Sequence, residues 1–270
     1  MLDQIFSLLV LSPTFQACIL DFRTTHAMFW PVAWADLGSF TGGTMNQSYR
    51  QLKLNKRAYD HLGLANAVLT VAHEYRHAWQ ATQRVLKRLF VRLDDQIINN
   101  RKIEGDAVAF ELTVAYELRD LGHPEIWNES IEFMLREHPE CIKAFTQAIK
   151  KNAQSLWNGR AQNAVLLAWQ HNRQRSAHYE ARNAKMFQSF NRASRRSKAI
   201  VRSTAVDDSE IDALLFKMPY AIVQDGKRVG VRHRGEYGKL MTVERSRLTR
   251  VTRPASLLLS ARLASHARMP

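Results

Sequence analysis

Val71-Ala72-His73-Glu74-Tyr75-Arg76-His77-Ala78-Trp79-Gln80 is the most specific pattern in this chain of 270 residues. Two histidines four residues apart on a helix project from one face, one turn apart, and together can hold a single metal ion. The glutamate directly after the first histidine can then take a proton from a water molecule at that ion. The spacing of His73, Glu74 and His77 therefore predicts a hydrolytic zinc site.

The pattern is predicted to lie on a buried helix. Apolar residues recur at helical spacing from Leu62 to Leu89, without a proline and with one glycine, Gly63, near the start. A helix in the core holds its side chains rigidly, as a metal site requires. Gln80 and Gln83 stand where a metzincin has its glycine and its third histidine, so that subclass is excluded.

A catalytic zinc ion usually takes three protein ligands and leaves one position for water, so a third ligand must come from another segment. A second helix is expected from Ile103 to Asp120, ending at Gly122. It carries Glu104 one turn before Ala107, and that small residue allows a close approach to the motif helix. Glu104 is the expected third ligand.

Asp106 and Glu111 are the alternatives to Glu104 for this role. Asp106 projects about 200° away from Glu104 around the helix, so it is better suited to support a ligating histidine from behind. Glu111 lies two turns beyond Glu104 on the same face and is a second candidate for such support.

His73-Glu74-Tyr75-Arg76-His77, followed by Glu104-Gly105-Asp106-Ala107-Val108-Ala109-Phe110, resembles the gluzincin group of zinc metallopeptidases, and compact intracellular bacterial members in particular. The resemblance covers residues 54–121. It implies that His73, His77 and Glu104 bind zinc and that Glu74 is the general base. It also implies a small sheet before the motif helix, whose edge strand holds an extended substrate.

Two segments ahead of the motif helix are predicted to be strands, Ala17–Phe22 and Tyr49–Asn55. The second alternates polar and apolar residues. An edge strand offers free N–H and C=O groups to an extended peptide. Tyr49–Asn55 is therefore either the edge strand that binds substrate or an ordinary strand of the sheet.

The expected fold is α+β, with a zincin-like domain over residues 1–122 that contains a small mixed sheet, the motif helix and the ligand helix. A helical extension is expected at 123–193, with helices at Pro124–Glu137, Pro139–Leu156 and Arg160–Arg192. A small basic β module is expected at 194–244, with a hairpin around Asp225-Gly226. The segment 245–270 has no acidic residue and is expected to be a disordered basic tail.

The net positive charge of the protein comes entirely from the second half of the chain. Residues 1–140 hold 14 Lys and Arg against 17 Asp and Glu, a net charge of −3, whereas residues 141–270 hold 25 against 8, a net charge of +17. Such a basic region favours contact with phosphate groups of nucleic acid or anionic lipid.

The cysteines and the N-terminal segment indicate in which cellular compartment the protein is expected. The two cysteines, Cys18 and Cys141, are far apart in sequence, which argues for a reducing environment. The apolar run Met1–Leu11 contains Asp3 where a secretory signal is positively charged, so a core helix is expected there. No apolar stretch is long enough to cross a membrane. A cytoplasmic location is predicted, or export as an effector by a route that the N-terminus does not reveal.

These observations predict a zinc-dependent endopeptidase that acts on an intracellular protein or peptide substrate. Its basic C-terminal half would locate the substrate or bind nucleic acid. The alternative is a protein that binds nucleic acid or an anionic surface, in which the zinc site is structural or inactive.

Overall fold

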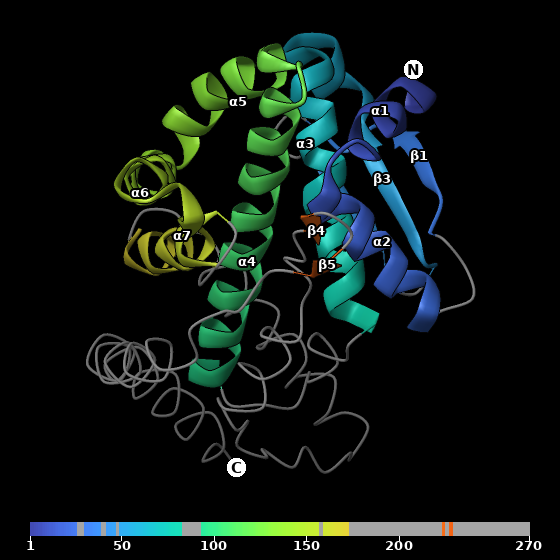
Figure 1. Cartoon of the computed structure of the whole chain (residues 1–270). Helices are drawn as coiled ribbons and strands as arrows, with labels where there is room; N and C mark the ends of the chain where they lie inside the picture. The colour runs from blue at the N-terminus through green and yellow to red at the C-terminus, as the bar shows by residue number, and fades with distance from the viewer. Residues whose placement is uncertain are drawn as a thin grey trace, which may run out of the picture.

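The computed structural model describes residues 1–25, 30–38, 42–46, 49–82, 93–156 and 159–172, together with 223–224 and 227–228. Two long helices, α3 (Lys56–Thr82) and α4 (Leu93–Asp120), pack side by side at its centre (Figure 1). On one side of this pair lie the sheet and helices α1 (Leu2–Leu9) and α2 (Pro13–Thr25). On the other side lie α5 (Pro124–Glu137), α6 (Pro139–Lys151) and α7 (Arg160–His171). The predicted α+β class is confirmed.

The sheet has three strands, β1 (Val32–Ala35), β2 (Gly43–Asn46) and β3 (Gln51–Asn55), in the order β1-β3-β2. Strand β3 runs parallel to β1 and antiparallel to β2, so the sheet is mixed, as expected. A strand is confirmed within Tyr49–Asn55, where β3 begins at Gln51, and of the two alternatives it is the ordinary strand and not the edge strand. Strand β3 is paired along both sides and has no free backbone edge to offer a peptide.

The predicted strand at Ala17–Phe22 is also wrong, because this segment lies inside helix α2. Its buried apolar residues, Phe15, Cys18 and Phe22, recur at intervals of three and four, which is helical spacing. The start of the helix is capped: Ser12 Oγ accepts a hydrogen bond from the Phe15 amide at 3.1 Å. A capped start and a helical apolar stripe outweigh the β-forming composition of the segment.

Helix α3 carries the motif and is kinked at Gly63, where the backbone takes φ 75° and ψ −170°. A residue with a side chain rarely adopts this conformation, so glycine permits the break. Beyond the kink the helix is anchored in the core by two polar side chains. The hydroxyl of Tyr75 donates to the carbonyl oxygen of Trp30 at 2.7 Å, and Nε1 of Trp79 donates to Asp21 at 2.6 Å. The motif helix is thus buried, as predicted, up to Thr82; residues 83–92 lie outside the described part.

The helices after the motif follow the prediction with shifted ends. Helix α4 begins at Leu93, ten residues before the expected start at Ile103, since no proline or glycine interrupts this stretch. Helix α5 has the predicted bounds. Helix α6 ends at Lys151, because the next residue, Asn152, is extended and caps a short 3₁₀ helix, η1 (Ala153–Ser155).

Several predictions concern residues near or beyond the end of the described part. Helix α7 is described to His171, and the remainder of the helix predicted to reach Arg192 lies outside the described residues. Strands β4 (Val223–Gln224) and β5 (Lys227–Arg228) pair antiparallel, which confirms the predicted hairpin. The tail 245–270 lies outside the described residues. The domain limits at residues 122, 193 and 244 stay predictions.

The N-terminal apolar run forms helix α1, whose Ile5 and Leu9 are fully buried in the core, as expected. Among the described residues, no single helix combines the length and apolar character needed to cross a membrane. By these two criteria alone, one pair of helices bent by 103°, Leu2–Leu9 with Pro13–Phe22, passes.

Candidate metal centre

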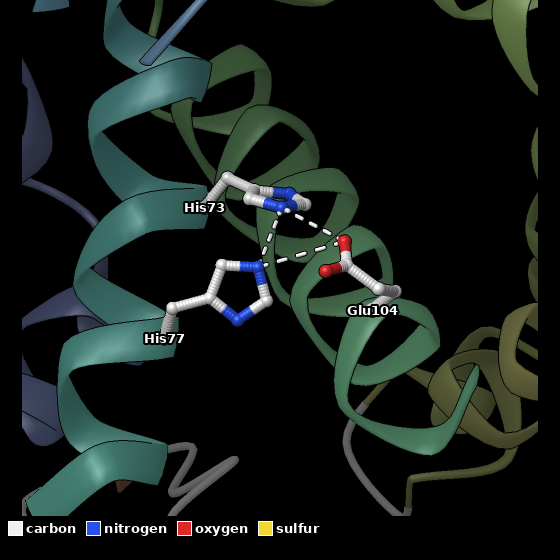
Figure 2. Close-up of side chains that lie close together, drawn as sticks. All are labelled: His73, His77 and Glu104. Carbon is white, nitrogen blue, oxygen red and sulfur yellow. Dashed lines mark hydrogen bonds and ion pairs between the residues drawn. The ribbon is translucent and has the colours of Figure 1, made fainter. Parts of the chain in front are cut away.

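Helices α3 and α4 bring together three side chains, those of His73, His77 and Glu104, that could hold a metal ion, as Figure 2 shows. The Nε2 atoms of His73 and His77 lie 3.0 Å apart. Oε2 of Glu104 lies 3.7 Å from Nε2 of His73 and 3.6 Å from Nε2 of His77. All three side chains keep partial contact with solvent, with exposed fractions of 19%, 11% and 19% for His73, His77 and Glu104.

These three atoms have the spacing of a zinc site. Ligand atoms held at zinc bond lengths of about 2.0–2.1 Å in a tetrahedron lie about 3.3 Å from one another. The observed separations of 3.0, 3.6 and 3.7 Å fall around that value. Two imidazole nitrogens and one carboxylate oxygen also form a donor set that suits zinc. Within the described part of the chain, His73, His77 and Glu104 are the group that satisfies this proximity.

Both imidazole rings are oriented by a hydrogen bond at Nδ1, the ring nitrogen that does not belong to the three-atom cluster. Nδ1 of His73 lies 3.0 Å from Oε2 of Glu111, and Nδ1 of His77 lies 2.8 Å from Oε1 of Gln80. A carboxylate or amide oxygen accepts only, so each Nδ1 carries a proton and donates it. The lone pair of each Nε2 is left to face the gap between the helices, which is the arrangement needed for metal binding.

Glu111 therefore contacts one of the two histidines directly, His73, as the sequence predicted. Asp106 reaches His77 only through an intermediate residue: Nε2 of Gln80 donates to Oδ2 of Asp106 at 2.9 Å. Asp106 also forms a fully buried ion pair with Arg76, whose Nε and Nη2 donate to its two oxygens at 2.8 and 3.1 Å. Removing one partner of such a pair costs about 3–5 kcal/mol.

The contact between Gln80 and His77 was not predicted from the sequence, where Gln80 served only to exclude the metzincin pattern. The signal that could have found it is the spacing, because a residue three positions after another on a helix lies beside it. The amide of Gln80 also donates to the carbonyl oxygen of Ile103 at 3.0 Å. Gln80 therefore connects the motif helix to helix α4 at the residue directly before Glu104.

The electrostatics of the cluster favour a positive charge between the three side chains. Burial disfavours a charged ring, but the carboxylates of Glu111 and Glu104 outweigh it and raise the pKa of His73 well above its ordinary value. Burial likewise opposes the charged form of Glu104, and the two histidines nevertheless lower the pKa of this carboxyl. The carboxylates that stabilise a positive charge on the rings would stabilise a metal cation between the three side chains in the same way.

Glu74 lies beside this cluster and under strand β2. A Cβ atom placed on Gly43 would lie 2.6 Å from Cγ2 of Thr70 and 3.1 Å from Cγ of Glu74. The absence of a side chain at Gly43 therefore lets β2 pass directly against Glu74. Strand β2 is an outer strand of the sheet, so one side of its backbone is unpaired within the sheet.

Replacing Gly43 by alanine is expected to lower any hydrolytic activity of the protein by about 10²-fold, because a displacement of Glu74 by about 1 Å spoils its alignment. Steady-state hydrolysis and zinc content would be measured on both proteins. Gly42→Ala is the matched control, because a Cβ there meets only Thr70, at 3.2 Å. Equal activity of Gly43→Ala and the unaltered protein would show that this close approach is unimportant.

Replacing Glu111 by alanine is expected to weaken zinc binding by about 10–100-fold, because His73 loses the acceptor that fixes its ring. Competition with a chromophoric chelator measures the dissociation constant. The control is Glu125→Ala, which removes an exposed carboxylate that pairs with His123 on helix α5. An unchanged zinc affinity in Glu111→Ala would rule out the supporting role.

Comparison with known protein families finds a match for this chain. A family described as "Putative metallopeptidase family (DUF6782)" matches residues 41–220, two thirds of the chain. The matched region contains β2, β3 and both helices of the metal centre. No curated protein and no solved structure matches the chain.

Proposed function

Because this chain belongs to the family described as "Putative metallopeptidase family (DUF6782)", we propose that it is a zinc-dependent endopeptidase of the gluzincin type. In this proposal His73, His77 and Glu104 bind the metal, and Glu74 is the general base. The observation that carries it is the convergence of two Nε2 atoms and one carboxylate oxygen from two helices on a single point.

A bound zinc ion would lower the pKa of a water molecule and polarise the carbonyl group of a substrate. Glu74 accepts the proton of the attacking water and later passes it to the leaving amine. Burial raises the pKa of the Glu74 carboxyl above its ordinary value, which makes its carboxylate a stronger base. The partners of Nδ1 on the two histidines, Glu111 and Gln80, keep both rings in the orientation that this reaction needs.

The proposed substrate is a polypeptide bound in an extended conformation along β2. An outer strand offers its free N–H and C=O groups to such a chain. Gly43 brings β2 against Glu74, so a peptide paired with the free edge of β2 would run alongside the strand that covers the proposed base. The sequence left open whether Tyr49–Asn55 is the edge strand that binds substrate; because β3 is the central strand, this role is proposed for β2 instead.

The proposal is tested on the full-length protein by zinc analysis and by cleavage of a fluorogenic peptide library. We expect one zinc ion per chain, hydrolysis that stops on dialysis against a chelator, and recovery when zinc is restored. Hydrolysis that survives complete removal of metal would contradict the proposal, as would a metal-loaded protein that cleaves no member of the library.

The role of the basic half stays a prediction. Most of residues 173–270 lie outside the described residues, and the net charge of +17 on residues 141–270 is what supports binding to nucleic acid or anionic lipid. Binding to DNA and to anionic vesicles, each measured against salt concentration, would show a steep salt dependence if phosphate contacts are made. The cytoplasmic location likewise stays a prediction.

A further inference from the structure

Gln80 of helix α3 is fully buried, and its side-chain amide connects the two helices that form the metal centre. The amide oxygen, Oε1, accepts a hydrogen bond from Nδ1 of His77 at 2.8 Å. The amide nitrogen, Nε2, donates to the carbonyl oxygen of Ile103 at 3.0 Å and to Oδ2 of Asp106 at 2.9 Å. The two N–H groups of the amide thus bond to helix α4, while its oxygen bonds to a proposed metal ligand.

The two acceptors on helix α4 decide which way this amide faces. A backbone carbonyl oxygen and a carboxylate oxygen accept hydrogen bonds and donate none, so the NH₂ end of the amide must face them. If the amide were turned end for end, its N–H groups would face Nδ1 of His77 instead. Nδ1 would then be the acceptor, and the proton of the neutral ring would lie on Nε2. A ring with a proton on Nε2 cannot bind a metal ion through that atom.

Asp106 is itself fixed by Arg76, and both side chains are fully buried. Nε and Nη2 of Arg76 donate to the two carboxylate oxygens at 2.8 and 3.1 Å. The guanidinium carbon lies 4.7 Å from the centre of the Phe110 ring and 5.2 Å from that of the Trp79 ring. A guanidinium bound to both oxygens fixes the plane of the carboxylate. Oδ2 of Asp106 is therefore held as an ionised acceptor at the position that the amide of Gln80 needs.

We propose that Asp106 is a positioning residue of the metal centre that acts through Gln80. By fixing the amide of Gln80, it keeps the proton of His77 on Nδ1 and leaves Nε2 available to the metal. The inference deepens the proposed function and rests on the metal centre of that proposal. Because Gln80 also bonds to Ile103, the residue before Glu104, the same amide ties the histidine ligand to the helix that carries the carboxylate ligand.

The test is a double-mutant cycle on the full-length protein, with the zinc dissociation constant from chelator competition as the readout. Gln80→Met keeps the length of the side chain and removes the acceptor of His77, so zinc binding should weaken by about 10–100-fold. Asp106→Asn offers Gln80 an N–H group as well as an oxygen, so the amide of Gln80 is no longer held in one orientation. We expect zinc binding to weaken by about 10-fold in this variant.

The variant with both changes should bind zinc no more weakly than Gln80→Met alone, because Asp106 acts on the metal only through Gln80. If the two effects multiplied instead, Asp106 would act independently of Gln80 and the inference would be overturned. Unchanged zinc binding in either single variant would overturn it as well. Gln147→Met is the matched control, because it makes the same change on the exposed surface of helix α6 and should leave the zinc dissociation constant unaltered.

A second way of removing the carboxylate guards against a loss of folding, because a buried charge that loses its partner is strongly destabilising. Arg76→Met combined with Asp106→Leu removes both charges together, a kind of replacement that is often neutral for stability. It also removes the acceptor of Gln80, so zinc binding should again weaken by about 10-fold, with no further loss when Gln80→Met is added. Thermal melting verifies that each variant is folded.

Peptide hydrolysis, measured on the same preparations, separates this inference from the proposed function. A protein that binds zinc and cleaves peptides, but in which the effects of Asp106 and Gln80 on zinc binding are independent, would overturn the inference alone. Zinc binding that depends on Asp106 through Gln80 in a protein that cleaves no peptide would overturn the proposed function and leave the positioning role in place.

Discussion

Glu74→Gln is expected to lower peptide hydrolysis by about 10²–10⁴-fold while zinc stays bound. Glutamine has the shape of glutamate but cannot accept the proton of the attacking water, and general-base catalysis contributes a factor of this size. The three side chains that surround the metal position are untouched by the change. Steady-state hydrolysis of a cleaved peptide and zinc analysis of the same preparation provide the measurement.

Glu132→Gln is the control for this variant, because it makes the same chemical change on the exposed surface of helix α5. It should retain full activity and full zinc content. If Glu74→Gln kept more than a tenth of the activity, another group would have to serve as the base. If it lost its zinc, Glu74 would be a structural part of the metal centre.

His77→Ala is expected to lower zinc affinity by at least about 100-fold and to abolish hydrolysis. A structural zinc site of four ligands contributes roughly 10–16 kcal/mol of binding, so one ligand carries on the order of 3 kcal/mol. The loss of His77 also frees Oε1 of Gln80, which now accepts from Nδ1 of that histidine. Elemental analysis of the purified variant and chelator competition measure the effect.

His61→Ala is the matched control, since His61 lies on the same helix but is exposed. Its zinc content and activity should equal those of the unaltered protein. Retention of one zinc ion per chain in His77→Ala at unchanged affinity would move the metal away from this cluster. Glu74→Gln and His77→Ala thus separate the base from the ligands. The first variant should lose activity with metal bound, and the second should lose the metal.

Much of the candidate site follows from local geometry and could be predicted from the sequence. A helix places residues four apart on one face whatever its surroundings, so the convergence of His73 and His77 needs only that this segment be helical. The contact between Glu111 and His73 was expected for a related reason, because Glu111 lies on the same helical face as Glu104. The kink at Gly63 and the helix α5 likewise follow signals carried by a few neighbouring residues.

The errors arose where the outcome depended on residues far away in the chain. Ala17–Phe22 has β-forming residues, but Glu117 of helix α4 accepts hydrogen bonds from Ser12 and from both the amide and the hydroxyl of Thr14, which helps to fix the start of a helix. Strand β3 is paired along both sides because β1 and β2 lie on either side of it. The sequence pattern within β3 does not indicate the positions of these two strands.

By itself the sequence determined that two imidazoles and a glutamate share one turn of a buried helix, because helical periodicity is a property of consecutive residues. Only the tertiary structure decided that Glu104 of helix α4 comes within reach of both histidines and that Gly43 of β2 lies against Glu74. These placements follow from the packing of whole helices and strands on one another, and packing joins residues whose separation along the chain carries no periodic signal.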